Sequence, residues 1–356
     1  MTAAAYQQVI DAPARERLDL FLATANRLGA PIGNVEKDFW VCWTLNALYH
    51  ELPAGPRLLF KGGTSLSKAF GLIQRFSEDI DLTVFRDDLN ETASVEELEQ
   101  LSGKKRKAKL EAIREACRTH VQGPLLTALS SIVEGVTKGA GRVEVDASDE
   151  HGQTLLIWYP EVEPRDAGYV RPVVRLELGA KSALDPSQSV TLRPYVAAEL
   201  PNRDLSVPDV LTIEPVRTFW DKIVILHGLK RWFERRGELR QGGERVSRHY
   251  YDLHCLKEAG MAASAAADQG LGADCVRHAR MFFDRPDFDL ASAVTGSFAL
   301  TPTKDMADAL ERDYANMAGM IFGTPPAFSA VLASVAEIDG LLNAPPPQTN
   351  GNEPSP

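Results

Sequence analysis

Two aspartates separated by one residue, Asp79 and Asp81, are the side chains best suited to chemistry in this sequence. They lie in RFSEDIDLTVF (75–85), whose alternation of polar and apolar residues predicts a β-strand. Alternate residues of a strand share a face, so we expect the two carboxylates about 6 to 7 Å apart beside Arg75 and Ser77. Hard oxygen ligands at this spacing suit Mg²⁺, and two such ions can stabilise an in-line displacement at phosphorus.

A glycine pair, Gly62 and Gly63, precedes this strand and is suited to bind phosphate. It follows a short predicted strand at 57–60 and leads into a helix predicted to begin at Thr64. Glycine lets backbone N–H groups approach phosphate oxygens closely, and the helix N-terminus adds a favourable dipole. We therefore expect a nucleotide-binding set that consists of Gly62, Gly63, Thr64, Ser65, Arg75 and Ser77.

The order strand, Gly-Gly turn, helix and DxD strand is similar to the arrangement of the nucleotidyltransferase superfamily. Taken singly, a DxD is usually a solvated strand end and a Gly-Gly pair is usually a plain turn. The resemblance implies a third carboxylate from a neighbouring strand, and Glu177 in VVRLELG is the candidate. A salt-bridged edge residue is the alternative for Glu177, and Asp146 is a weaker substitute. The implied metal site holds two Mg²⁺ ions on Asp79, Asp81 and Glu177.

The segments KGGTSLSKAF and RFSEDIDL closely resemble the signature of the AbiEii/AbiGii nucleotidyltransferase-like toxin family, which includes the MenT toxins of mycobacteria. VEKDFWV, FWDKIVILHGLKR and SRHYYDLHCL extend the resemblance over roughly residues 30 to 340. It implies that Lys222 reaches the triphosphate and that Asp252 is the acidic residue of the last motif, where His249 departs from the family pattern. The alternatives are a solvated helix face for Lys222 and an i,i+4 ion pair with Arg248 for Asp252. The implied catalytic set is Asp79, Asp81, Lys222, Glu177 and Asp252.

The resemblance also implies a reaction and its partners. The expected reaction is Mg²⁺-dependent transfer of a nucleoside monophosphate from an NTP to an acceptor. The acceptor expected first is the tRNA 3′ end, so that translation stops, with an AbiEi-like antitoxin encoded by a neighbouring gene. The alternatives are a small-molecule or protein nucleotidyltransferase and a non-catalytic antitoxin-binding scaffold of the same fold.

Nucleic-acid binding would need local positive charge, and two segments carry it, 103–109 and 230–248. Each is otherwise an ordinary solvated helix face. We favour the second segment because it links Lys222 to Asp252. Its candidate contacts to the acceptor are Arg231, Arg235, Arg236 and Arg248.

The chain as a whole is acidic, with 39 basic and 49 acidic side chains among 356 residues and a net charge of −10. This balance argues against a protein that coats nucleic acid, although a local basic site remains compatible with it. The four cysteines have no zinc-knuckle or CxxC spacing and suit a reducing cytosol. The first residues lack the apolar stretch of a signal peptide, and the most apolar window, 39–49, is shorter than a membrane span. We expect a cytoplasmic protein with no membrane partner.

The elements that must position these residues predict an α+β fold. A nucleotidyltransferase-type mixed sheet flanked by helices is expected, with strands at 57–60, 75–85, 141–145, 154–159 and 173–178. From Pro208 onward the pattern predicts almost only helix. The expected domains are a catalytic domain with N-terminal helices (1–205), a helical C-terminal domain that contributes the Lys, Arg and Asp motif residues (206–343), and a disordered tail (344–356).

Overall fold

A computed structural model of the chain describes residues 2–77, 79–162, 171–240 and 245–344. Its contacts divide the chain into two compact units, which we call unit 1 and unit 2. Unit 1 is Met1–Thr218 with Met317–Pro325, and unit 2 is Phe219–Asn316 with Pro326–Pro356. The predicted domain division stays a prediction, and the predicted disordered tail lies outside the described residues except for Ala344.

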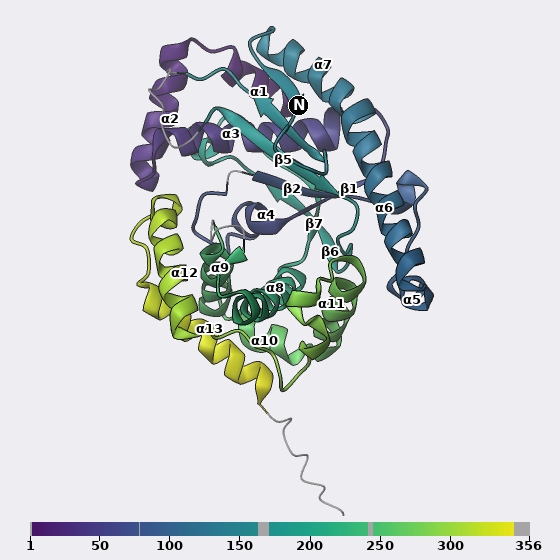
Figure 1. Cartoon of the computed structure of the whole chain (residues 1–356). Helices are drawn as coiled ribbons and strands as arrows, with labels where there is room; N and C mark the ends of the chain where they lie inside the picture. The colour runs from purple at the N-terminus through teal and green to yellow at the C-terminus, as the bar shows by residue number, and fades with distance from the viewer. Residues whose placement is uncertain (1, 78, 163–170, 241–244, 345–356) are drawn as a thin grey trace, which may run out of the picture. The chain divides into compact units, whose positions relative to one another are not determined.

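Unit 1 contains a seven-stranded mixed sheet (Figure 1). The strand order is β3-β4-β5-β2-β1-β7-β6. The pairs β2–β5 and β1–β7 are parallel, and the other neighbours are antiparallel. The predicted α+β class with a mixed sheet is therefore confirmed. The strands are β1 (Leu58–Lys61), β2 (Asp79–Val84), β3 (Arg142–Val145), β4 (Thr154–Trp158), β5 (Val173–Gly179), β6 (Ser187–Leu192) and β7 (Val207–Ile213).

The sequence pattern after Pro208 predicted almost only helix and no strand, whereas Val207–Ile213 forms β7 next to β1. Asp209 has a left-handed backbone with φ +53°, which breaks the strand's alternation of side chains. Buried apolar residues consequently recur every third position, at Val207, Val210 and Ile213, and imitate a helical spacing. β6 was also missed, since its sequence SQSVTL is mostly polar.

The helices of unit 1 begin with α1 (Thr2–Ile10), α2 (Ala14–Leu28) and α3 (Ile32–Asn46). α3 is buried from Gly33 to Asn46 and contacts β5 and β7. Between β2 and β3 the chain forms several separate helices, because Ser94 and Ser102 cap new N-termini. The remaining helical elements are α4 (Gly62–Lys68), α5 (Val95–Gln100), α6 (Gly103–His120), α7 (Leu126–Thr137) and the π-helical turns η1 (Ala47–Glu51) and η3 (Val121–Leu125).

The described part of unit 2 is helical, in agreement with the predicted helical C-terminal region. The buried ring of Trp220 anchors its core, where Nε1 donates to the carbonyl of Ala265 at 3.0 Å. Gly272 lies so close to this ring that a Cβ there would overlap it. No helix in the described ranges is long and apolar enough to cross a membrane. The helices are α8 (Pro215–Arg236), whose residues up to Thr218 belong to unit 1, α9 (Ser247–Glu258), α10 (Met261–Ala267), α11 (Gln269–Phe282), α12 (Lys304–Met317) and α13 (Phe328–Asn343).

Candidate active site

The Gly-Gly turn sits directly against a predicted catalytic carboxylate in unit 1. β1 ends at Lys61, and the chain enters α4 through Gly62, whose φ of +78° favours glycine. A Cβ at Gly62 would overlap Oδ2 of Asp81, and a Cβ at Gly63 would overlap Nη2 of Arg75. A side chain at either position would therefore overlap a neighbouring residue, which favours glycine at both. The turn is adjacent to Asp81 and Arg75.

The hydroxyls beside the turn hold its own backbone in place. Ser65 Oγ donates to the carbonyl of Gly62 at 2.8 Å. Thr64 Oγ1 hydrogen-bonds with Ser77 Oγ at 2.7 Å and donates to the carbonyl of Asp79. Thr64 and Ser65 are both buried. These contacts connect α4 to the start of β2, while a direct contact of either hydroxyl with phosphate stays a prediction.

The three predicted metal ligands share one face of the sheet. In the parallel pairing of β2 with β5, Asp81 is the Cα partner of Glu177. Asp79 lies two residues before Asp81 and is likewise half-buried, so both point to the face that Glu177 shares. Side chains on the opposite face, such as Ile80 and Leu82, are fully buried. Lys61, the β1 partner of Asp81, joins this polar face, and the sequence pattern did not single it out.

Arg175 orients the third carboxylate. It pairs in register with Asp79 on β2, and its guanidinium lies 3.2 Å from Glu177 and 3.2 Å from Asp146. Burial alone would raise the pKa of Asp146, but hydrogen bonds from Ser148 and the charge of Arg175 outweigh it and lower that pKa. Asp146, the weaker sequence candidate, thus reaches the same cluster through Arg175.

A buried ion pair anchors α4. Lys68, the last residue of α4, pairs with Asp38 of α3, and both side chains are at most 5% exposed. The Lys68 ammonium lies 3.4 Å from the ring centroid of Tyr195, whose backbone N–H donates to Asp38 Oδ2 at 2.7 Å. Burial alone would lower the pKa of Lys68, but the charge of Asp38 outweighs it and raises that pKa. A charged ammonium therefore fixes the short helix behind the turn.

Arg75 is held by a segment that returns from far along the sequence. It is 4% exposed and forms a β-bridge with Ile321 in the Met317–Pro325 part of unit 1. Next to it, the Phe76 N–H donates to the carbonyl of Met320 at 2.7 Å. The predicted strand therefore starts at Asp79, and Arg75 precedes it in a separate bridge.

Unit 2 brings together the two motif residues that the family resemblance named there. Lys222 Nζ donates to Asp252 Oδ2 at 2.7 Å, and the two side chains are 7% and 0% exposed. Lys222 is thus part of a buried pair on α8 and α9, which excludes a solvated helix face. Breaking a buried ion pair of this kind by removing one partner costs about 3 to 5 kcal/mol.

The predicted acceptor-binding arginines of unit 2 are mostly paired with acids. Arg231 lies 2.9 Å from Glu234, and Arg236 lies 2.6 Å from Asp287. Arg235 is a longer 3.9 Å from Asp287. Arg248 is half-buried on α9, and residues 241–244 of the predicted basic segment lie outside the described residues. Their contact with nucleic acid stays a prediction.

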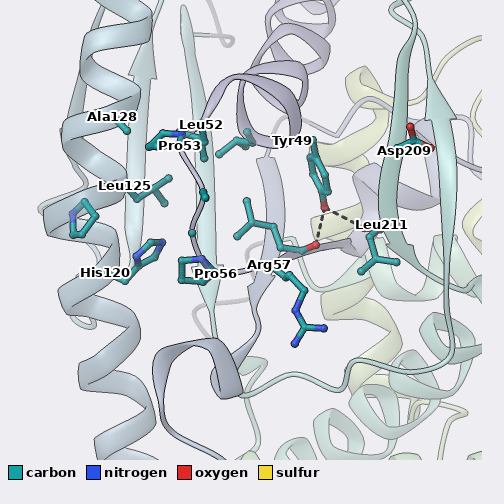
Figure 2. A pocket seen from close by; sticks show the side chains of 15 residues that line it. Tyr49, Leu52, Pro53, Pro56, Arg57, His120, Leu125, Ala128, Asp209 and Leu211 are labelled. Atoms are coloured by element: carbon teal, nitrogen blue, oxygen red, sulfur yellow. Dashed lines mark hydrogen bonds between the residues drawn. The ribbon is translucent and has the colours of Figure 1, made fainter.

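A cavity of about 600 Å³ lies elsewhere in unit 1 (Figure 2). Its wall is mainly apolar and includes Leu52, Pro53, Pro56 and Leu125, with η1 and η3 on either side. Tyr49 stands in it with its hydroxyl bonded to the carbonyls of Leu58 (3.2 Å) and Leu211 (3.0 Å). No predicted site residue lines this cavity, so it is separate from the face that carries Asp79 and Asp81.

A family model described as nucleotidyl transferase AbiEii toxin, type IV TA system, matches residues 46–334. The chain belongs to this family. The match spans β1 to α13 and confirms the resemblance inferred from the sequence. As an AbiEii family member, the protein is a nucleotidyltransferase toxin with an NTP as substrate and an antitoxin as partner.

Among solved structures, the AbiEii chain is similar to MenT4, a nucleotidyltransferase toxin from Mycobacterium tuberculosis H37Rv. The identity is 19% over 90% of this chain and 89% of that one, with a TM-score of 0.48. Among curated proteins, the comparison finds no match.

Metal binding by this AbiEii member depends on a small set of oxygen donors. In the described ranges, no group of three or more His, Cys, Asp or Glu side chains is arranged to hold a metal ion. Two carboxylates of β2 with a third in register on β5 still fit Mg²⁺, which keeps waters and binds through one or two carboxylates and substrate phosphates. The assignment of Asp79, Asp81 and Glu177 as ligands stays a prediction.

Proposed function

We propose that this toxin transfers a nucleoside monophosphate from an NTP to the 3′ end of a tRNA in a Mg²⁺-dependent reaction and thereby stops translation. One observation carries the proposal: the carboxylate of Asp81 lies against the Gly62 turn and in register with Glu177. The adjacency of the Gly62 turn and Asp81 supports phosphoryl transfer, in which a phosphate-binding turn and a metal-binding carboxylate must lie side by side.

In this proposal the chain's own residues position the substrate. Backbone N–H groups at Gly62 and Gly63 bind the triphosphate, and buried Arg75 adds positive charge behind Gly63. Asp79, Asp81 and Glu177 would hold Mg²⁺, which when bound lowers the pKa of the acceptor hydroxyl and neutralises phosphate charge. The family resemblance assigns the stabilisation of the leaving pyrophosphate to Lys222, whose ammonium pairs with Asp252.

The transfer exchanges one bond at the α-phosphorus for another. The acceptor hydroxyl oxygen forms a bond to the α-phosphorus, and the bond from that phosphorus to the oxygen bridging to the β-phosphorus breaks. Pyrophosphate leaves with that oxygen. The hydroxyl proton passes to Glu177 or to water.

The test incubates the purified full chain with total tRNA, Mg²⁺ and each α-labelled NTP in turn. Label on tRNA is expected with at least one nucleotide and is expected to vanish in Asp81→Asn. The matched control is Asp87→Asn, an exposed aspartate on the 3-10 turn Arg86–Leu89, which should keep full activity. Label on a protein or small molecule but never on RNA would refute the tRNA acceptor, and no label on any acceptor would refute the transferase activity proposed here.

A further inference from the structure

The direction from which the acceptor enters follows from in-line displacement, and this step rests on the proposed function. The attacking and leaving oxygens lie on opposite sides of the phosphorus. The triphosphate is placed at the Gly62 turn, which lies on the β1 side of Asp81, whereas Glu177 lies on the β5 side. The acceptor therefore extends from Glu177 over β5, β4 and β3, away from β1.

That part of the sheet carries a surface that we call the acceptor face, made of Arg142, Glu144, Leu156, Trp158, Arg171 and Arg175. Pairing registers place most of these on the side of Asp79: Leu156 pairs with Arg175 and with Glu144. Trp158 pairs with Arg142 and with Val173, which lies two residues before Arg175. The intervening residues Leu155 and Ile157 are buried on the opposite face. A half-exposed indole and a half-exposed leucine thus lie in line with the catalytic carboxylates.

The indole of Trp158 is hydrogen-bonded and lies near two guanidinium groups. Its Nε1 donates to Glu144 Oε1 at 2.7 Å. The guanidinium carbon of Arg142 lies 4.6 Å from the ring centroid, and that of Arg171 lies 5.0 Å away. Arg142 is 62% exposed, so its outer N–H groups are open to solvent. Indole and guanidinium planes are both surfaces on which unstacked bases of RNA stack.

We propose that the acceptor face binds the single-stranded 3′ end of the RNA acceptor, with a base stacked on Trp158 or on a guanidinium beside it. Arg142 and Arg171 then bind the flanking phosphates. Trp158 is two strands from Asp79 and two residues further along, a separation of about 12 Å. That distance accommodates a few nucleotides at about 3.4 Å per stacked base. A stable protein partner would favour an apolar centre, whereas here two guanidinium groups lie beside the indole of Trp158.

The test measures steady-state transfer with RNA and NTP varied separately, and equilibrium binding of a fluorescent single-stranded RNA with a free 3′ hydroxyl. Trp158→Leu is expected to raise the KM for RNA and the Kd of the oligonucleotide about tenfold, the size of one lost base stack. Arg142→Gln is expected to raise both constants through the loss of a phosphate contact. The KM for NTP stays unchanged, and Trp158→Phe retains most of the affinity. Arg142→Gln should also reduce the slope of log binding constant against log salt concentration by about one, which corresponds to the loss of one phosphate contact.

The matched control is Arg57→Gln. Like Arg142, Arg57 is 62% exposed. Its guanidinium pairs with Asp88 and lies 4.3 Å from the ring centroid of Phe85, but Arg57 lies outside the acceptor face. It should leave both constants unchanged. Because Arg142 is exposed, we expect Arg142→Gln to fold, and it can therefore test the proposal even if Trp158→Leu fails to fold.

The outcomes separate the two proposals. Transfer to RNA with an unchanged RNA KM in folded Trp158→Leu and Arg142→Gln overturns the acceptor face alone. The same holds if these variants lose affinity for the antitoxin but not for RNA. RNA binding that depends on Trp158 without any transfer overturns the proposed reaction and supports the face. Neither binding nor transfer by the wild type overturns both.

Discussion

Replacement of Gly62 by alanine tests the contact between the turn and Asp81 on which the proposed active site depends. The left-handed backbone at φ +78° costs a residue with a Cβ about 1–2 kcal/mol of stability. The new methyl group would also overlap Asp81 Oδ2, so this carboxylate must move by about 1 Å. A displacement of that size in a catalytic group lowers activity about 10²-fold.

Gly71→Ala is the matched control for this experiment. Gly71 has φ +63°, and no atom lies within 4 Å of the position that a Cβ would take, so it carries the backbone cost without the overlap. Gly71→Ala should lose about 1–2 kcal/mol of unfolding free energy in urea, the cost of a left-handed residue, and Gly62→Ala should lose at least as much because of its overlap. Only Gly62→Ala should lose nucleotide transfer, measured as label from an α-labelled NTP on the acceptor at saturating substrate.

The comparison can refute the reasoning in two ways. If Gly62→Ala transfers nucleotide within a few-fold of Gly71→Ala, the contact between the turn and Asp81 has no part in the reaction. If both variants are equally inactive while folded, the loss comes from the left-handed backbone and not from displacement of the carboxylate.

Three further predictions concern buried or hydrogen-bonded charges. Lys222→Met removes the cation that pairs with the buried carboxylate of Asp252, so the free energy of unfolding in urea should fall by about 3–5 kcal/mol. The double variant Lys222→Met/Asp252→Leu should largely restore it, and equal stability of the single and double variants would contradict the prediction. Burial lowers the pKa of His227, whose Nδ1 accepts from the Ala299 N–H, so the folded state resists protonation. The contribution of neutral His227 to the free energy of unfolding should be complete above pH 6.5 and should decrease as the pH drops below it. The thermal unfolding temperature of His227→Gln should therefore depend less on pH between about 7 and 5. Burial alone would raise the pKa of Asp149, but hydrogen bonds from two backbone N–H groups and a threonine hydroxyl lower it. The ionised carboxylate therefore stabilises the fold above pH 3.8, and this stabilisation is lost as the pH falls below that value. Asp149→Asn should cost about 1–3 kcal/mol at neutral pH and much less near pH 3, measured by urea unfolding at both values.

Local patterns were sufficient for the parts of the site that are close in sequence. Strand, Gly-Gly turn, helix and DxD strand follow within about thirty residues, and period-two alternation correctly predicted that Ile80 and Leu82 face the core. The same reasoning failed at β7, where one left-handed residue, Asp209, changed the period of the apolar positions. Alternation is a reliable signal only while the backbone stays in the β region.

By itself, the sequence determined the family, the mixed α+β class and the residue types that chemistry at phosphorus requires. The tertiary structure decided which distant residues meet. Parallel pairing of β2 with β5 places Glu177 beside Asp81. The Met317–Pro325 segment forms a β-bridge with Arg75, and Lys222 hydrogen-bonds to Asp252, thirty positions away in the sequence. Burial of apolar surface and hydrogen bonding across the whole fold favour these pairings, and they must outweigh the entropy lost in closing long loops. No local sequence period encodes that balance.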